Sequence, residues 1–466
     1  MQFIADLNNK INGIVWGLPM MVLILGVGIY LSVGCGFPQF SHFIHIMKNT
    51  LGKAFEKSEK KEGAVSPFKA MCTALAASIG TGNIAGVSGA IAIGGPGAVF
   101  WMWISALLGM CTKYAEVTLA IKYRERNEAG DWVGGPMYYI KNGLGKNWKW
   151  LGIVFAIFGA LAAFGIGNMT QINTIASTVN TAISEFFSTS DSQQLIIAWV
   201  VSIICSVICG IVLLGGIERL ADVCALLVPV MAVIYIIAAI IVILVNITSI
   251  PAAFGAIFKG AFHPASVAGG LAGVGIKTAF IKGVGRGIFS NEAGLGSAPI
   301  AHAAADVDHP VKQGMFGVFE VFMDTIVVCT MTALVAILGN GIENIQFGKD
   351  IGAQLTINGF MSVFPGKIAA TCVAICLSLF AISTVLTWAL YGTRCIEFLM
   401  GYKASKVYQI IFCGFACIAG AVKLELAWAI ADTLNGLMAI PNLIAVALLS
   451  PVVIKLTKEY FQAVKK

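Results

Sequence analysis

The chain has 466 residues, of which 58% are hydrophobic and only 11% are charged, and its mean hydropathy is +0.87. Because soluble domains carry about 25% charged residues, this composition excludes an ordinary soluble protein. The formal net charge of +7 comes from loop residues and not from a basic stripe, so it indicates membrane topology rather than nucleic-acid binding. We therefore predict an all-α polytopic membrane protein in which residues 1–466 form a single transmembrane domain.

Apolar segments long enough to cross a bilayer recur along the chain, and we expect eleven of them. They cover residues 14–34, 68–95, 98–121, 150–186, 194–214, 218–246, 273–304, 313–339, 367–393, 405–421 and 427–455. The first has no basic region before it and is long enough to span, so we expect a membrane helix there and not a cleaved signal. The twelve cysteines lie almost all in apolar segments, which favours small buried side chains over a metal or redox centre.

Lysine and arginine are concentrated in alternate loops. Residues 36–69, 122–149 and the tail 455–466 are rich in them, whereas the other set of loops carries few. Positively charged loops mark the cytoplasmic side of a membrane protein. We therefore predict that these segments and the C-terminus are cytoplasmic, and that the N-terminus lies outside the cell membrane.

Two glycine-rich sequences interrupt apolar segments at the depth where a membrane helix should be most regular. They are SIGTGNIAGVSGA at 78–90 and GVGRGIFSNEAGLGSAP at 283–299. Irregular backbone in hydrocarbon is tolerated only around a cavity, and paired breaks point to the binding site of a secondary transporter. The predicted topology makes the two broken segments cross in opposite directions. We therefore predict two inverted five-helix repeats, 68–246 and 273–455, after the extra helix 14–34.

Side chains at the two breaks are candidate ligands. Asn83 could cap a half-helix and present an amide oxygen, and Gly82 allows backbone angles that other residues avoid. A glycine-rich packing helix is the alternative explanation of the first break. Ser290, Asn291 and Glu292 place polar groups at membrane depth in the second break, either as ligands or as a structural anchor of the turn.

Two further segments could complete a pocket. Gln171, in 150–186, supplies an amide oxygen for an ammonium group, although helix packing explains such a residue equally well. Ser383 and Thr384 are adjacent hydroxyls that could bind a small hard cation, or could bond to the carbonyl one turn earlier. Trp388 lies one turn beyond Thr384 on the same face and would narrow the pocket, unless it only packs.

The acidic residues that are candidates for proton coupling are Glu116, Glu292 and Asp324. Glu116 follows Lys113 by one turn, for which a local ion pair is the simpler interpretation. Glu320 and Asp324 share a helix face, and Asp324, near mid-membrane, is a candidate gating or coupling acid. The five histidines are scattered among loops and segment ends, so we do not expect a proton relay.

Five motifs together resemble the alanine or glycine:cation symporter family, the sodium:alanine symporters of the amino acid-polyamine-cation superfamily. They are GTGNIAGV (80–87), WVGGPMYYI (132–140), KGVGRGIFSNEAGLGSAPIAHAAA (282–305), FEVFMDT (319–325) and STVLTWALYG (383–392). The similarity runs over essentially the whole chain. It implies a LeuT-like five-plus-five inverted repeat with broken helices 2 and 7 and an extra N-terminal helix.

The resemblance also implies which residues bind substrate and ion. The substrate carboxylate would meet backbone near Thr81, and the substrate ammonium would meet Asn83 and Gln171. The implied substrate-binding residues are Thr81, Gly82, Asn83, Gln171, Phe289, Ser290, Asn291, Thr384 and Trp388. The implied Na⁺ ligands are the carbonyls of Ala76, Ile79 and Phe380 and the hydroxyls of Ser383 and Thr384.

The predicted function is sodium-coupled symport of a small neutral amino acid, alanine or glycine, into the cell by alternating access. A proton-coupled carrier of the same fold is the alternative. An ion channel would need a filter repeat, and an intramembrane enzyme would need a motif such as HExxH or GxSxG, and the sequence has none of these. We expect Na⁺ as coupling ion, no other cofactor, no nucleic-acid partner and no obligate protein partner.

Overall fold

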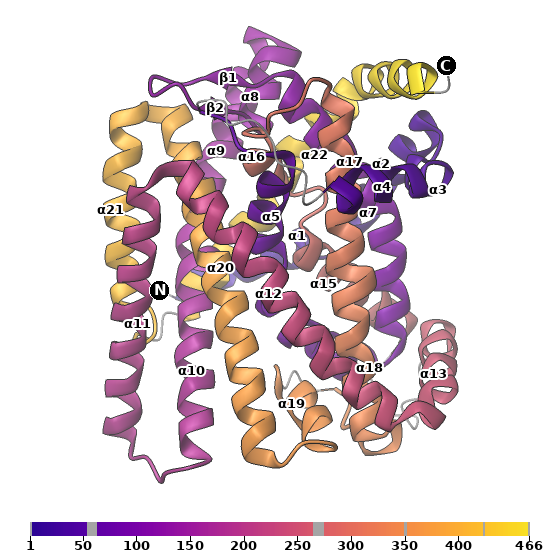
Figure 1. Ribbon diagram of the computed structural model, residues 1–466, viewed down its shortest axis with the longest axis vertical. Coiled ribbons are helices and arrows are strands. Elements are labelled where there is room, and N and C mark those ends of the chain that lie inside the picture. The colour runs from indigo at the N-terminus through magenta and orange to yellow at the C-terminus, as the bar shows by residue number, and fades with distance from the viewer. Residues whose placement is uncertain (1, 54–62, 264–274, 349–351, 423–424, 465–466) are drawn as a thin grey trace.

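The computed structural model describes residues 2–53, 63–263, 275–348, 352–422 and 425–464. Within these ranges the chain is almost entirely helical, and long helices lie side by side with their ends at two opposite faces (Figure 1). The elements of the first half are α1 (Gln2–Val15), α2 (Leu18–Cys35), α3 (Pro38–Ser41), α4 (Phe43–Thr50), η1 (Leu51–Lys53), α5 (Pro67–Ser78), η2 (Thr81–Asn83), α6 (Ala85–Gly94), α7 (Gly97–Lys122), β1 (Glu125–Arg126), β2 (Trp132–Val133), α8 (Pro136–Tyr139), η3 (Ile140–Leu144), η4 (Lys146–Trp148), α9 (Lys149–Phe164), η5 (Gly165–Met169), α10 (Thr170–Ser184), α11 (Asp191–Leu214) and α12 (Gly216–Val245). Those of the second half are η6 (Ile247–Ser249), α13 (Ile250–Phe262), α15 (Ile276–Asn291), α16 (Ala298–His302), α17 (Pro310–Val321), η7 (Phe322–Cys329), α18 (Thr330–Asn340), η8 (Ile342–Asn344), α19 (Gln354–Met361), α20 (Gly366–Met400), α21 (Tyr402–Ile418) and α22 (Glu425–Val464).

The described part of the chain contains eight helices that are long and apolar enough to cross a membrane by themselves, or nine if the bent pair α5–α6 is one span. The protein is therefore a multi-pass membrane protein. The predicted seventh span, 273–304, contains α15, of 16 residues, and the predicted tenth span, 405–421, largely overlaps α21, of 17 residues. Both helices fall just short of that length. The count of eleven spans, and the division into repeats 68–246 and 273–455, remain predictions.

Several predicted bounds differ from the structure. Helix begins at Gln2 and not at residue 14, so that α1 and α2 form one continuous apolar stretch, Phe3–Cys35. Residues 247–272 were expected to be a loop, but they contain the apolar helix α13. Both differences have one cause, because a helix shorter than a full span carries too few apolar residues to stand out from a loop.

The first predicted break is present and lies between α5 and α6. Ser66 caps α5, with its Oγ accepting a hydrogen bond from the Lys69 N–H at 3.3 Å, and Pro67 occupies the first helical position. After Ser78 the chain leaves the helix, passes through the single turn η2 and resumes as α6, with a bend of 58° between the halves. Residues 78–84, which form the bend between the two half-helices, are all buried.

The second predicted break follows α15. Glu292 ends that helix in the left-handed conformation, with φ of 56°, and two glycines with φ of 93° and 82° follow at positions 294 and 296. A side chain at position 296 would place its Cβ 2.6 Å from Pro136 Cγ, so only glycine fits there. The short helix α16 then starts at Ala298, and the break is therefore a tight glycine turn between two helices.

Two other spans contain wide π-helical turns, η5 between α9 and α10 and η7 between α17 and α18. A π-turn inserts an extra residue into a helix and is common at functional sites. Here η5 ends two residues before Gln171, and η7 contains Asp324 and Thr325. Both π-turns therefore carry residues of the predicted binding region or its neighbours.

The segments rich in lysine and arginine lie towards one face of the molecule. Helices α3 and α4, the hairpin β1–β2 and α8 lie in the upper part of Figure 1, as does the C-terminus, whereas α13 and α19 lie at the opposite end. The hairpin is antiparallel, with Glu125 opposite Val133, and Val65 bridges in parallel to Ala305 nearby. All twelve cysteines are free thiols and most are buried, consistent with the predicted role as small buried side chains.

Helix α7 is the element against which both the second break and α17 pack. Close approach to α15 depends on small residues, because a Cβ at Gly283 would lie 2.2 Å from the Ala98 carbonyl oxygen and one at Gly287 would lie 2.4 Å from Ser105 Oγ. In the first break, by contrast, a Cβ at Gly86 would meet nothing closer than Arg286 Cδ at 3.8 Å. Gly283 and Gly287 of α15 thus mediate tight packing against α7, whereas Gly86 does not mediate tight helix packing.

Candidate functional site

The side chain of Asn83 closes the first break and ties it to the second half of the chain. Its Oδ1 accepts a hydrogen bond from the Gly80 N–H at 2.8 Å, and its Nδ2 donates to Asp324 Oδ1 at 2.7 Å. Asn83 is fully buried. The capping role predicted for this residue is therefore present, while its amide oxygen is already engaged by backbone.

Gly82 and Phe289 bring the two breaks into contact. A Cβ at Gly82 would lie 3.3 Å from Phe289 Cδ1, so the phenyl ring lies directly against the backbone of η2. On its other side Phe289 lines a cavity of about 160 Å³, and Trp16, which lies between α1 and α2, Arg286 and Asp432 are among the other lining residues. Phe289 thus separates this cavity from the first break.

Ser290 and Asn291, at the end of α15, face the π-turn η7. Ser290 Oγ donates to Asp324 Oδ2 at 2.9 Å, and Asn291 Nδ2 donates to Thr325 Oγ1 at 3.0 Å. Asn291 Oδ1 accepts from the Ala293 N–H at 3.0 Å, which satisfies backbone exposed by the second break. The two breaks and η7 therefore meet at one buried polar cluster around Asp324.

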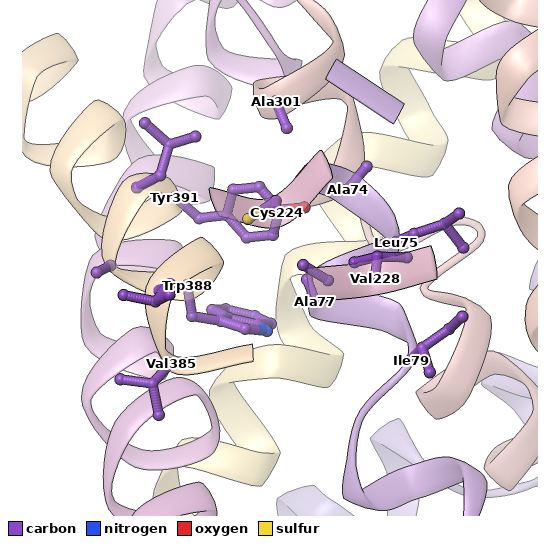
Figure 2. Packing of buried hydrophobic residues seen from close by; sticks show 14 of the residues in the cluster. Ala74, Leu75, Ala77, Ile79, Cys224, Val228, Ala301, Val385, Trp388 and Tyr391 are labelled. Carbon is purple, nitrogen blue, oxygen red and sulfur yellow. The ribbon is translucent and has the colours of Figure 1, made fainter. Parts of the chain in front are cut away.

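Trp388 of α20 packs against η5, next to Gln171. The fit requires glycine, because a Cβ at Gly167 would lie 2.1 Å from Trp388 Cβ. Figure 2 shows the Trp388 and Tyr391 side chains projecting from α20 into the interior towards α5, and their rings are 5.5 Å apart. Gln171, one turn beyond Gly167, donates from Nε2 to the Ile166 carbonyl at 3.1 Å, and its buried Oε1 has no hydrogen-bond partner among the described residues.

The hydroxyls of Ser383 and Thr384 converge on the carbonyl at the inner part of the first break. Each donates to the Ala76 carbonyl at 3.1 Å, and they reach the Phe380 carbonyl at 2.8 and 3.0 Å respectively. Both residues are buried, and Met231 Sδ lies 3.6 Å from Ser383 Oγ. The structure thus brings together four of the five predicted ion ligands. Ile79, the fifth, ends α5 with ψ of 87°, outside helical geometry.

The predicted substrate residues are also buried. Phe289 is the exception, because it is partly exposed. The buried ones are Thr81, Gly82, Asn83, Gln171, Ser290, Asn291, Thr384 and Trp388. Thr384 joins the two groups, since a Cβ at Gly80 would lie 2.7 Å from its Oγ1. The candidate ion ligand Thr384 therefore contacts the backbone of the first break at Gly80. An ion and a substrate could influence one another through this contact.

A buried ionic network lies on the α16 and α17 side of this site. Glu320 of α17 accepts from Lys113 Nζ at 3.1 Å and from Ser78 Oγ at 2.9 Å through Oε1, and its Oε2 lies 2.9 Å from His302 Nε2. The Lys113, His302 and Glu320 side chains are all 0% exposed. The expected local pair between Lys113 and Glu116 is wrong, because tertiary packing places the carboxylate of α17 closer to the ammonium.

Glu116 instead accepts hydrogen bonds from the second break and from α22. Its Oε1 accepts from the Gly294 N–H at 3.1 Å and from the amide of Asn442 in α22, while its Oε2 has no partner among the described residues. Glu292 accepts from Ser297 Oγ at 2.6 Å across the same turn. The interpretation of Glu292 as a structural anchor of the break therefore fits its contacts.

Three residues of the site were not found from sequence. They are Asn442, Met231 and Cys329, and their segments have the sequence of ordinary apolar helices. Cys329 Sγ lies 3.4 Å from both Ser290 Oγ and Asn83 Nδ2, and Met231 Sδ lies near Ser383 Oγ. Asn442 follows Pro441 inside α22, and this proline within a helix is the only local sequence feature that could have drawn attention to Asn442. Asn168 Nδ2, three residues before Gln171, donates to the Phe412 carbonyl at 2.8 Å and so connects η5 to α21.

Two broken helices around a buried polar site define a secondary active transporter, and solved structures place the fold among LeuT-type transporters. The chain is similar to MhsT in complex with L-phenylalanine, with a TM-score of 0.56 and 13% identity over 85% of this chain and 99% of that one. It is also similar to a manganese transporter of Eremococcus coleocola, with a TM-score of 0.51 and 13% identity over 88% and 91% of the two chains.

The family is shown by sequence. The model of the sodium:alanine symporter family matches residues 1–466, and the protein belongs to that family. The chain is 47% identical to the sodium/alanine symporter AgcS of Methanococcus maripaludis, over 99% of this chain and 98% of that protein. It is 38% identical to the amino-acid carrier protein AlsT of Bacillus subtilis (98% and 92% covered) and 37% identical to the probable sodium/glutamine symporter GlnT of the same organism (98% and 91%).

Proposed function

We propose that this protein carries a small neutral amino acid, alanine or glycine, into the cell together with Na⁺. The observation that carries the proposal is the convergence of the Ser383 and Thr384 hydroxyls on the Ala76 carbonyl, beside the unwound backbone of the first break. Hydroxyl and carbonyl oxygens are the ligands that a small hard cation prefers. The relatives AgcS, a sodium/alanine symporter, and AlsT, an amino-acid carrier protein, support the same substrate class.

The substrate would lie between the first break and Trp388. The N–H groups near Thr81 and Gly82, at the start of a half-helix, suit a carboxylate. The Gln171 Oε1 atom, buried without a partner, suits the ammonium group. Asn83 would add its amide oxygen only by releasing the Gly80 N–H, and Phe289, Ser290 and Asn291 would form the opposite wall.

Coupling follows from the shared boundary of the two sites. Na⁺ held by Thr384 and Ala76 would fix the end of α5, and the same fixed backbone offers its N–H groups to the substrate. Each ligand then stabilises the conformation that the other needs, and thermodynamic linkage makes this effect mutual. Alternating access would be a rocking of the two halves about this centre.

We further propose that the face carrying α3, α4, β1, β2 and α8 is cytoplasmic and that the protein lies in the cell membrane. This face also holds the C-terminus (Figure 1), and its loops contain the lysines and arginines that predict the inner side. The N-terminus would then lie outside. Phe289 and the cavity next to it would form part of the outer entrance to the site.

Uptake of radiolabelled L-alanine into proteoliposomes tests the function directly. An inward Na⁺ gradient should drive alanine above its equilibrium concentration, whereas an equal K⁺ gradient at the same pH should not. Equal uptake with both cations would remove sodium coupling. It would favour a proton-coupled carrier, for which Glu116, with one oxygen unpartnered among the described residues, would be the first residue to test.

Replacing both hydroxyls of the candidate ion site should weaken sodium dependence. Ser383→Ala with Thr384→Ala removes two oxygen ligands, each worth roughly 0.5–1.5 kcal/mol as a hydrogen-bonding group. The Na⁺ concentration for half-maximal alanine uptake should rise by about tenfold. Thr371→Ala is the matched control, because Thr371 lies on the same helix and bonds only to the Lys367 carbonyl one turn earlier. An unchanged Na⁺ dependence in the double variant would place the ion elsewhere.

A further inference from the structure

An apolar groove lies between the neighbouring helices α10 and α20, at the ends of these helices that are furthest from the hairpin β1–β2 (Figure 1). Its volume is about 400 Å³, within the range of roughly 300–1,000 Å³ that is usual for ligand sites. The lining residues include Val179, Ile183 and Phe186 on one side and Ala374, Ile375 and Leu379 on the other. Every lining residue that the structure describes is uncharged, so the groove suits a hydrocarbon chain.

The groove lies at the boundary of the membrane. Helix α11, which follows the turn after α10, begins with the polar residues 191–194 and is apolar from Leu195 onwards, where Leu195 and Ile196 are exposed. This change places the lipid headgroups at the level of the turn between α10 and α11. Phe186 and Phe187 of that turn are 52% and 71% exposed, as expected for side chains in contact with lipid. The groove therefore faces the acyl chains of the leaflet on this side, which is the outer leaflet in the proposed orientation.

A cation lies at the mouth of the groove. Lys367 Nζ is 5.3 Å from the centre of the Phe186 ring, and this ring lines the groove. Lys367 is exposed. Within the described parts of the chain, no ion pair includes Lys367 or Glu185, the acidic residue next to Phe186. The groove thus combines an uncharged trough with an ammonium group that is available to an anion at the level of the headgroups.

We propose that this groove binds a phospholipid with an anionic headgroup. One acyl chain lies between α10 and α20, and the phosphate faces Lys367. An uncharged hydrocarbon would leave the ammonium group without a counter-charge, and inorganic phosphate would leave the apolar trough exposed, whereas an anionic phospholipid satisfies both. The binding itself does not depend on the proposed sodium coupling.

The two helices that hold the acyl chain also carry the candidate transport site. Leu379 lines the groove and directly precedes Phe380, whose carbonyl accepts hydrogen bonds from Ser383 and Thr384. Helix α10 carries Gln171. A chain held between α10 and α20 favours one spacing of these helices, so bound lipid changes the rate of alanine uptake. This consequence, unlike the binding, rests on the proposed function.

The thermal unfolding midpoint of the purified full-length protein in detergent tests the binding without relying on transport. Dioleoylphosphatidylglycerol should raise the midpoint more than the same concentration of dioleoylphosphatidylcholine. Lys367→Gln should increase the phosphatidylglycerol concentration needed for half of this effect about fivefold, the contribution of one basic residue at an anionic lipid surface. Ala182→Phe places a ring in the groove and should abolish the preference for phosphatidylglycerol.

Two matched variants at exposed positions of α13 are the controls. Lys259→Gln removes a lysine and Ala252→Phe adds a ring outside the groove, and both should respond to the two lipids as the unchanged protein does. An unchanged midpoint without added lipid shows that a variant is folded, and Lys367→Gln, at an exposed position, keeps the test available if Ala182→Phe does not fold.

The outcomes separate this inference from the proposed function. Equal effects of the two lipids on the unchanged protein would overturn the proposal, as would an undiminished response of a folded Ala182→Phe variant or an equal loss in Lys367→Gln and Lys259→Gln. If the lipid responses are as expected but alanine uptake into vesicles needs no Na⁺, the lipid site stands and the proposed sodium coupling fails.

Discussion

Replacing Lys113 with methionine should destabilise the protein by about 3–5 kcal/mol, the cost of leaving a buried carboxylate without its partner. Lys113 Nζ and Glu320 Oε1 are 3.1 Å apart, and both side chains are 0% exposed. Methionine fills similar space but leaves Glu320 with only Ser78 and His302. The thermal unfolding midpoint in detergent, with and without alanine, measures the effect.

Two further variants decide whether the pair is responsible. Lys113→Met combined with Glu320→Gln should recover most of the lost stability, because the remaining side chain is neutral. Lys312→Met removes the cation of an exposed pair with Asp308, whose side chain is 74% exposed, and should cost no more than about 1 kcal/mol. Equal unfolding midpoints for Lys113→Met and Lys312→Met would contradict the argument.

Gly167→Ala should abolish most alanine binding. The new methyl group would lie 2.1 Å from Trp388 Cβ, so either Trp388 or the π-turn η5 must move. Overpacking of this kind costs roughly 1–3 kcal/mol, which corresponds to a loss of affinity of about tenfold or more if it falls on the bound state. Binding of radiolabelled alanine at saturating Na⁺ measures it.

The control for this variant is another glycine in the middle of a membrane helix. Gly414→Ala in α21 adds the same methyl group where nothing lies within 4 Å, so alanine affinity should stay unchanged. If Gly167→Ala binds alanine as tightly as Gly414→Ala, Trp388 does not form a wall of the substrate pocket. Na⁺ binding by Gly167→Ala should be retained, because Ser383 and Thr384 contact α5 and not η5.

The breaks could be predicted from sequence because their signal is local. Gly80, Gly82, Gly294 and Gly296 interrupt apolar runs, and each interruption is visible within about ten residues. The pairing of Ser383 with Thr384 was visible for the same reason. Short helices such as α13 were missed, because their apolar stretches are too short to distinguish from interfacial loops.

The partners of the buried polar groups could not be predicted. Lys113 lies one turn from Glu116 but pairs with Glu320, which is 207 residues away, and Asn83 bonds to Asp324 across 241 residues. Helical spacing identifies only neighbours on the same helix. Which carboxylate meets which cation depends on how the helices pack, and that information is spread over many small packing contacts.

Composition, periodicity and the two glycine-rich motifs by themselves determined that the protein is a helical membrane transporter, where its helices break, and which hydroxyls and amides are available as ligands. These properties follow from how much of each segment can be buried in lipid and from backbone angles that glycine alone allows. Only the tertiary structure decided that Trp388 packs against Gly167, and that Lys113 pairs with Glu320 of α17 and not with Glu116 of its own helix. The physical reason is that buried charges and hydroxyls take whichever partners the packed helices bring within hydrogen-bonding distance.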